Sequence, residues 1–182
     1  MKWLFTLLLG LTVLAGCAHE HRLAVRVMSY NIRHGEGMDH RVDLPRIAEV
    51  IRAADPDIVS LQEVDRGVER TQHIDEPAQL GELTGMQSIF ARNIEYQGGD
   101  YGNAVLTRLP VLDHQNHFLP RTRAGEQRGM LALTVLAGNR PFLFLATHFD
   151  YHARKASGLD QRRWSARLRC SMMTNPSSSP AT

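Results

Sequence analysis

Two apolar stretches of the strand type lie near the start of the chain, and each ends in one polar side chain. In residues 23–28, apolar residues recur with a period of two, which predicts a strand running into Asn31. In residues 57–65, the sequence DIVSLQEVD begins as a continuous apolar run, which predicts a buried strand that reaches Glu63. Asn31 and Glu63 are therefore the first candidates for a functional site.

The segment between these two strands carries a helical pattern. Apolar residues recur at spacings of three, four and seven from Leu44 to Ile51, Asp43 precedes them as a candidate N-cap, and Pro45 suits a first turn. The Asp-Pro-Asp sequence at 55–57 ends the helix. A strand, helix, strand order favours a right-handed parallel crossover, which places both strand ends at one carboxyl edge, where open α/β sheets bind ligands.

The rest of the chain predicts one short helix and several antiparallel strands. Residues 77–83, with Gly85 just beyond them as a C-cap, predict the helix. Strands are expected at residues 88–91, 104–107, 129–137 and 141–149, the last two joined by a hairpin. This order implies an α/β (α+β) fold with a mixed, mainly antiparallel sheet and helices on one face, and no linker divides it into two domains.

The start of the chain has the layout of a secretory signal. Lys2 precedes an apolar run over residues 3–13, which is shorter than the roughly 20 residues of a membrane span. The Leu-Ala-Gly-Cys that follows resembles a bacterial lipobox, so we predict a signal peptide over 1–16 and a lipid anchor on Cys17. Ala18 suits an outer-membrane lipoprotein of the cell envelope that faces the periplasm. The alternative is an ordinary signal peptide that is cut without lipidation.

Charge is distributed unevenly along the chain. Residues 1–150 contain 15 Lys and Arg against 18 Asp and Glu, whereas residues 151–182 contain six basic residues against Asp160 alone. A basic tail permits contact with nucleic acid, while a net acidic body argues against tight duplex binding. Besides Cys17 the chain has only Cys170, so no disulfide framework is expected.

Four motifs follow one another in a fixed order along the chain. They are VMSYNIR (27–33), SLQEVD (60–65), YGNAVLTR (101–108) and ATHFD (146–150). With these motifs the chain resembles the endonuclease/exonuclease/phosphatase family of DNase I-like hydrolases over residues 22–151. The resemblance implies a four-layer sandwich of two facing sheets with helices outside, and hydrolysis of phosphate esters with Mg²⁺ or Mn²⁺.

The resemblance also implies a role for three side chains. Asn31 matches the family asparagine near the metal and the scissile phosphate, Glu63 the principal metal carboxylate, and His148 the histidine that contacts the phosphate or leaving group. A hard ion needs only one or two carboxylates when it keeps its waters and binds substrate phosphate. Taken singly, each residue has a structural alternative, as a strand cap, an ion-paired carboxylate or a hydrogen-bonded imidazole.

Three further residues in or beside the motifs are candidate substrate contacts, although their chemistry is open. They are Arg33, Asn103 and Asp150. The remaining histidines show no spacing typical of a zinc site, such as a helical i, i+4 pair with a glutamate base. Zinc is therefore not indicated, and the cofactor that the resemblance implies is Mg²⁺ or Mn²⁺.

The tail departs from the family pattern. Family members continue with a strand ending in Gly-Asp-x-Asn and a late Ser-Asp-His, and residues 152–182 contain neither. The codons of residues 171–182 can also be read in a shifted frame. If their third bases take permitted values, that frame encodes DDDEPVILAGD, which is the pattern that the family shows at this point of the chain. We therefore predict a frameshift between about 151 and 171 and a truncated chain that is inactive or nearly so. The alternative is a genuine disordered basic extension, and the coding DNA would decide between them.

The function expected from the sequence is hydrolysis of a phosphate ester such as a nucleic acid or a phospholipid headgroup. The motifs do not define the substrate, and no obligate protein partner is predicted. The rival hypothesis is a non-catalytic envelope lipoprotein that binds anionic lipid or nucleic acid through the arginines of residues 154–169.

Overall fold

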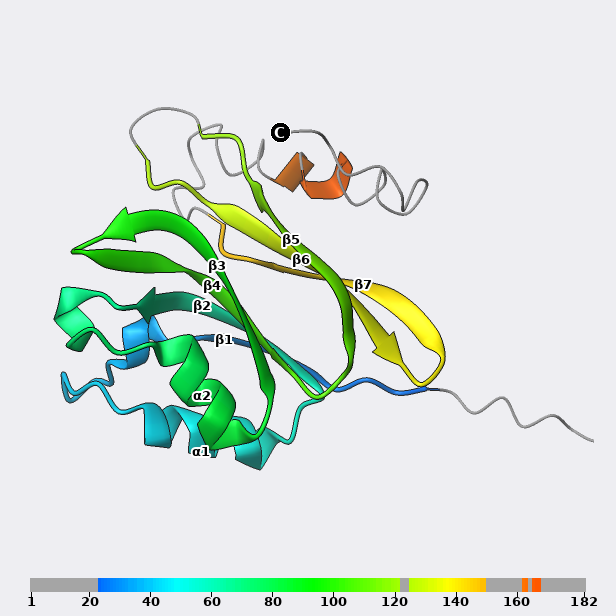
Figure 1. Ribbon diagram of the computed structural model, residues 1–182, viewed down its shortest axis with the longest axis horizontal. Helices are drawn as coiled ribbons and strands as arrows, with labels where there is room; N and C mark the ends of the chain where they lie inside the picture. The colour runs from blue at the N-terminus through cyan, green and yellow to red at the C-terminus, as the bar shows by residue number, and fades with distance from the viewer. Residues whose placement is uncertain (1–22, 122–124, 150–161, 164, 168–182) are drawn as a thin grey trace, which may run out of the picture.

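Two β-sheets face each other, and two helices cover the outer face of the larger sheet (Figure 1). The computed structural model describes residues 23–121, 125–149, 162–163 and 165–167. The predicted signal peptide, Cys17, Asp150 and nearly all of the basic tail lie outside the described residues. In the described part, no helix has both the length and the apolar character needed to cross a membrane.

The described elements include all the predicted helices and strands in the predicted order, together with β5, η1 and η2, which were not predicted. They are β1 (Val27–Asn31), η1 (Arg33–Gly35), α1 (Leu44–Ala54), β2 (Ile58–Arg66), η2 (Glu69–Thr71), α2 (Glu76–Thr84), β3 (Gln87–Tyr96), β4 (Gly99–Thr107), β5 (Val111–Phe118), β6 (Gly129–Ala137) and β7 (Arg140–Thr147). The larger sheet has the order β1-β2-β4-β3 and the smaller one β5-β6-β7. Only β1 and β2 pair in parallel, so the larger sheet is mixed, as predicted.

The caps of both helices explain where they begin and end. The Asp43 carboxylate accepts the Arg46 N–H at 3.0 Å at the start of α1, and Asp75 accepts the Ala78 N–H at 2.9 Å at the start of α2. Gly85 ends α2 with a φ of 67°, a left-handed conformation that glycine adopts without steric cost. Both predicted helices are therefore present, and α2 is one residue longer at each end.

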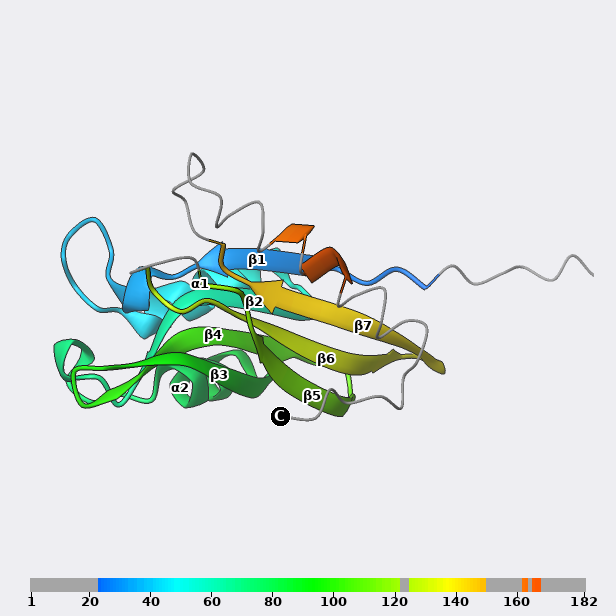
Figure 2. The same ribbon diagram turned by 90° about the horizontal axis from the view of Figure 1, so that it is seen from above.

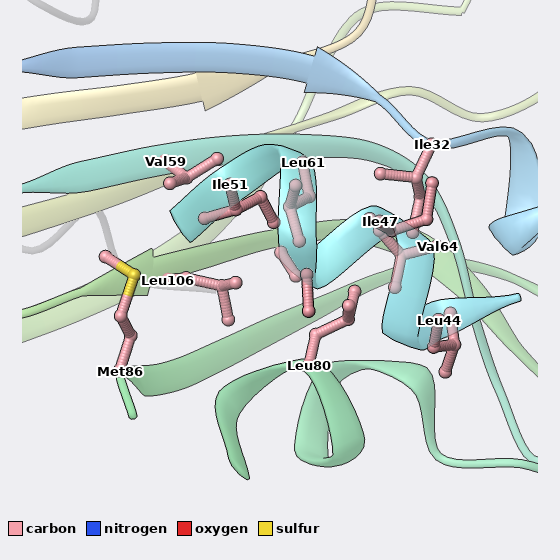
Figure 3. Packing of buried hydrophobic residues seen from close by; sticks show 12 residues of the cluster. Ile32, Leu44, Ile47, Ile51, Val59, Leu61, Val64, Leu80, Met86 and Leu106 are labelled. Atoms are coloured by element: carbon pink, nitrogen blue, oxygen red, sulfur yellow. The ribbon is translucent and has the colours of Figure 1, made fainter. Parts of the chain in front are cut away.

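Two separate apolar cores hold the three layers together. The first fills the space between the helices and the larger sheet, where Ile51 and Leu80 of the helices meet Leu61 and Leu106 of the strands (Figure 3). The second lies between the sheets, and its buried members are Ile58, Ile89, Ala91, Val105, Leu131, Leu133, Val135 and Ala146. Each fully buried Leu or Ile stabilises the fold by about 1.5–3 kcal/mol relative to an exposed one.

The two sheets are stacked face to face (Figure 2). Seen from above, β7 lies over β2 and β4, and β5 lies over β3 (Figure 2). β7 ends and β6 begins at the side of the molecule where β1 and β2 end (Figure 1). Four chain segments that are distant in sequence therefore converge at one edge of the sandwich.

The strands differ from the prediction in three places. β3 and β4 form one long hairpin rather than two short strands, and β5 has no counterpart in the prediction. Gly102 allows β4 and β3 to approach closely, because a Cβ at this position would lie 2.0 Å from the Ala91 carbonyl oxygen. The apolar alternation at Leu23, Val25 and Val27 does not mark the residues of β1 that face the helical core. Those residues are Met28 and Tyr30, whereas Val27 is 60% exposed.

Candidate functional site

Asn31, the last residue of β1, and Glu63 of β2 are in direct contact, although β2 continues past Glu63 to Arg66 and so does not end at Glu63 as predicted. Asn31 is the last residue of β1 and lies opposite Gln62 of β2 in the parallel register. Its side-chain nitrogen Nδ2 donates a hydrogen bond to Oε1 of Glu63 at 2.7 Å. The crossover therefore joins the two candidates at the carboxyl edge of the sheet, as the strand pattern predicted.

A β-bulge turns Glu63 toward this edge. In the pairing of β2 with β4, Leu61 lies opposite Ala104 and Val64 opposite Gly102, so two residues of β2 face the single residue Asn103. Glu63 has a φ of 59°, in the left-handed region that a non-glycine residue rarely adopts. Bulges of this kind redirect a side chain out of the regular alternation. The bulge thus takes the Glu63 side chain out of the regular alternation of β2 side chains between the two faces of the sheet.

The turn after β1 fixes the amide of Asn31. The Arg33 N–H donates to Oδ1 of Asn31 at 3.0 Å, and the Ile32 N–H donates to the Gln62 carbonyl at 3.1 Å. Because one end of the amide accepts and the other donates, its orientation is determined by two bonds. The side chain of Arg33 itself is exposed beside this turn, so its predicted role as a substrate contact stays a prediction.

His148 reaches the same edge from the end of β7. Its Nε2 lies 3.9 Å from Oε1 of Glu63, and its Nδ1 lies 3.1 Å from Nη1 of Arg128. A guanidinium has only donors, so Nδ1 accepts from Arg128 and the neutral imidazole carries its proton on Nε2. The geometry therefore aims an N–H donor of His148 at the site.

Arg128 holds His148 from a buried position just before β6. It is 8% exposed, and its Nη1 also donates to Oε1 of Glu126 at 2.9 Å. Sequence reasoning missed both residues, because neither lies in a motif. The only available signal was the position of Arg128 directly before an apolar strand, and a charged residue there is common.

Asn103 is buried between the sheets rather than at the exposed edge. It is 1% exposed, and its Nδ2 donates to the Gly129 carbonyl at 3.2 Å. The Thr147 hydroxyl donates to the same carbonyl at 2.9 Å. Asn103 therefore ties β4 to the start of β6, next to Arg128, and its predicted contact with substrate stays a prediction. Asp150 lies outside the described residues.

The donor set at this edge suits a hard ion better than zinc. Within the described residues, no three His, Cys, Asp or Glu side chains gather as a protein-only metal cage requires. Mg²⁺ keeps several waters and needs one or two carboxylates plus substrate phosphate. The partly exposed Glu63, with the amide of Asn31 beside it, fits such an ion. Structural zinc sites use four nitrogen or sulfur ligands, which this edge does not offer.

A buried ion pair supports the strand beyond the bulge. Asp65, fully buried, accepts from Nε and Nη2 of Arg70 at 2.7 and 2.8 Å, and this pairing raises the pKa of Arg70. Tyr101, opposite Asp65 in β4, has a raised pKa because of burial and the negative charges of Glu126 and Glu63. Sequence reasoning missed this group because its members are scattered along the chain.

Glu76 braces the same strand from the helical side. Its Oε2 accepts the Asp65 N–H at 2.8 Å, while its Oε1 is buried without a hydrogen-bond partner among the described residues. Burial raises the pKa of Glu76 to about 8, against the opposing effect of the Asp65 N–H. A protonated carboxyl is therefore the preferred form of this side chain at neutral pH.

The chain is similar to a described protein family and to curated relatives. The model of the Endonuclease/Exonuclease/phosphatase family matches residues 28–172. Over 123 residues the chain is 30% identical to the Uncharacterized protein YbhP of Escherichia coli (strain K12), a match that covers 63% of this chain and 48% of that protein. The chain thus spans about half the length of the curated relatives it matches.

Solved structures show the same fold. An endonuclease/exonuclease/phosphatase from Beutenbergia cavernae matches with a TM-score of 0.61 and 28% identity, over 79% of this chain and 42% of its own. TDP2 from Caenorhabditis elegans matches with a TM-score of 0.61 and 23% identity, over 85% of this chain and 44% of its own. These likenesses confirm the predicted DNase I-like α/β sandwich.

Proposed function

The chain belongs to the Endonuclease/Exonuclease/phosphatase family, and we propose on that basis that its site hydrolyses phosphate esters with the help of a divalent metal ion. The observation that carries the proposal is the meeting of Glu63, Asn31 and His148 at one edge of the sandwich. Asn31 ends β1, Glu63 lies at the bulge within β2 and His148 directly follows β7, so three strands contribute to this edge of the sandwich.

Each of the three side chains has a distinct part in the proposed mechanism. Glu63 would hold Mg²⁺ or Mn²⁺, and the bound ion would neutralise charge on the phosphoryl oxygens. Asn31 orients the Glu63 carboxylate through its N–H without taking or losing a proton. His148 donates Nε2–H to a phosphate oxygen, and Arg128 keeps the ring in that tautomer. Arg33 is exposed next to Asn31 and is the nearest candidate for a second phosphate contact.

The activity of this chain is proposed to be low, because the frameshift predicted from residues 151–182 would remove the Gly-Asp-x-Asn carboxylate that the family resemblance assigns to the attacking water. Within the described part, Glu63 is engaged by Asn31, and Glu126 is engaged by Arg128. A missing general base costs a rate factor of roughly 10²–10⁴. A chain in which the shifted reading frame of the tail is restored is expected to be faster by a factor in that range.

The direct test is hydrolysis of bis-p-nitrophenyl phosphate by the chain and by its frame-restored version. We expect Mg²⁺-dependent release of p-nitrophenol that is lost in EDTA and returns with Mg²⁺. Glu63→Gln should lower the rate at least 100-fold, whereas the matched control Glu82→Gln, exposed on α2, should leave it unchanged. A Glu63→Gln variant with the parent rate would reject the metal assignment, and equal rates in both chains would reject the argument from the tail.

We also propose that the chain is exported and anchored in the bacterial envelope through a lipid on Cys17. The proposal rests on the signal layout and the Leu-Ala-Gly-Cys sequence at its end. Growth with radiolabelled palmitate should label the parent chain and not Cys17→Ser, while Cys170→Ser should be labelled like the parent. Labelling that survives in Cys17→Ser would exclude this anchor.

The rival hypothesis of a non-catalytic binding lipoprotein has no observation in its favour. It depends on the arginines of residues 154–169, and the structure describes only 162, 163 and 165–167 of that segment. Hydrolysis is therefore the function that the described geometry supports best.

A further inference from the structure

A small pocket is lined by residues of η2, β3, β4 and the segment before β6, and it has no part in the mechanism above. Its volume is about 190 Å³, and its lining residues are Arg70, Ile94, Tyr96, Tyr101 and Glu126. Pockets for drug-sized ligands measure roughly 300–1,000 Å³, so this one admits a single ring system rather than a large ligand.

Two residues that line the pocket, Tyr101 and Glu126, are neighbours of the candidate site. Tyr101 lies opposite Asp65 in the β2–β4 pairing, two positions beyond Glu63, and the charge of Glu63 contributes to its raised pKa. Glu126 accepts from Arg128, which in turn holds His148. A group in the pocket would therefore lie beside a phosphate bound at Glu63 and His148.

The walls of the pocket are aromatic and preorganised. The rings of Tyr96 and Tyr101 are 6.4 Å apart between centroids and tilted by 56°. The guanidinium carbon of Arg70 lies 4.8 Å from the centroid of Tyr96 and 5.4 Å from that of Tyr101. Because Asp65 accepts from two nitrogens of Arg70, moving the guanidinium away would leave the buried Asp65 carboxylate without its partner charge.

Arg70 still has donor capacity for a ligand. Its Nη1 donates to none of the described residues, while its charge is permanent at physiological pH. Glu126 supplies acceptor oxygens on another wall. The pocket thus offers both donors and acceptors beside two tyrosine rings.

Both charges in the pocket are already paired, Arg70 with Asp65 and Glu126 with Arg128, so the pocket has no spare charge to compensate an ionic occupant. Arg70 disfavours a quaternary ammonium or amine, such as a choline or ethanolamine headgroup, even though two tyrosines are present. Glu126 disfavours a second phosphate or a carboxylate. The remaining class is a neutral, planar group that bears both hydrogen-bond donors and acceptors and stacks on aromatic rings.

We propose that this pocket binds one unpaired nucleobase of a nucleotide whose phosphate lies at Glu63 and His148. The substrates would then be single-stranded nucleic acid or small nucleotide esters rather than phospholipid headgroups. The assignment rests on the proposed function for the position of the phosphate, but base binding is measurable without hydrolysis. Stacking of a base on an aromatic side chain is worth about 1–3 kcal/mol, or roughly 5–150-fold in affinity.

Isothermal titration of the full chain in Mg²⁺ with adenosine 5′-monophosphate, ribose 5-phosphate and phosphocholine tests the proposal. The nucleotide should bind at least about tenfold more tightly than ribose 5-phosphate, which lacks only the base, and phosphocholine should bind no better than ribose 5-phosphate. Tyr96→Leu should remove the preference, Tyr96→Phe should keep it within about twofold, and the control Phe118→Leu, an exposed aromatic of β5, should not alter it.

Three results would overturn the base pocket: equal affinity for the nucleotide and ribose 5-phosphate, including absence of binding by both; a preference for phosphocholine; or a base preference that survives Tyr96→Leu. Thermal unfolding of each variant shows whether it is folded. If Tyr96→Leu does not fold, Tyr96→Phe still tests the pocket, because a change in the base preference of more than about twofold in that variant would contradict stacking on the ring. A base preference without hydrolysis of bis-p-nitrophenyl phosphate would reject the proposed hydrolase activity and leave the pocket standing.

Discussion

The amide nitrogen of Asn31 donates to Oε1 of Glu63 at 2.7 Å, which links the end of β1 to the bulge within β2 across 32 positions of sequence. The amide oxygen of Asn31 accepts the Arg33 N–H, so turning the amide over would break both bonds. Asn31 thus presents a donor to the carboxylate at every pH. A carboxylate held by a neutral donor keeps one orientation toward a cation.

Asn31→Asp should test this relationship through pH dependence. The substitution places two carboxylates at hydrogen-bond distance, and one of them then retains a proton because like charges at that separation disfavour double ionisation. We expect kcat for bis-p-nitrophenyl phosphate to fall by about 10² and the rise of activity with pH to shift upward. The control is Asn139→Asp in the β6–β7 turn. An unchanged pH profile in Asn31→Asp would argue against a shared site.

Arg128→Met should release His148 while keeping a long side chain at the start of β6. The imidazole would lose the donor that makes Nδ1 an acceptor, so both tautomers would be populated. A decrease in kcat of about 10- to 100-fold is expected. The ¹⁵N chemical shifts of the His148 ring report the tautomer directly, and a purely structural role of Arg128 would leave a single Nε2–H tautomer in the variant.

Glu76→Gln should stabilise the fold in alkaline solution. The folded-state pKa of Glu76 is about 8, above the ordinary glutamate value of 4.5, so between these pH values the folded chain holds a proton that the unfolded chain has released. This group therefore makes the free energy of unfolding decrease as pH rises from about 4.5 to 8, and its effect is constant above that. Glutamine cannot ionise, and it keeps an oxygen for the Asp65 N–H.

The measurement is thermal unfolding of the parent chain and Glu76→Gln at pH 5 and pH 9. We expect a higher Tm for the variant at pH 9 and a difference of no more than about 2 °C at pH 5. Glu82→Gln, an exposed change on the same helix, serves as the control. Equal Tm differences at the two pH values would show that Glu76 does not titrate in this window.

Asp65→Ala should destabilise the chain strongly, because it leaves Arg70 without its buried partner. Removing one member of a buried ion pair costs about 3–5 kcal/mol. Arg70 is partly exposed, with 28% of its side chain accessible, so we expect a loss near the lower limit, about 3 kcal/mol, in urea unfolding. The double variant Asp65→Ala/Arg70→Met should recover part of that loss. A single variant within 1 kcal/mol of the parent would contradict a strong pair.

Several parts of the fold were predictable from local sequence. Asp43 and Gly85 mark helix ends through short-range hydrogen bonds and backbone freedom, so the two helices were found with errors of one residue. The Gly138-Asn139 turn likewise identified the β6–β7 hairpin. β5 was missed because residues such as Asp113 and His114 face away from the core and interrupt the apolar pattern.

The candidate site was predictable only in part. Asn31 and Glu63 were found because a parallel crossover brings strand ends together, and His148 was found through the resemblance of its motif. Arg128 and Tyr101 carry no local signal. Their roles depend on which strand lies opposite which, and a register is set by the packing of whole sheets rather than by neighbours in sequence.

Local chemistry along the chain was enough to determine the helices, most strands, the parallel crossover and the two side chains at its ends, because capping, alternation and turn formation act over a few residues. Tertiary structure alone decided that Glu63 leaves its strand at a bulge, that Arg128 sets the tautomer of His148, and that Arg70 is clamped between Asp65 and two tyrosines. Those relationships join residues from separate strands, and they exist only once the cores between the layers have closed.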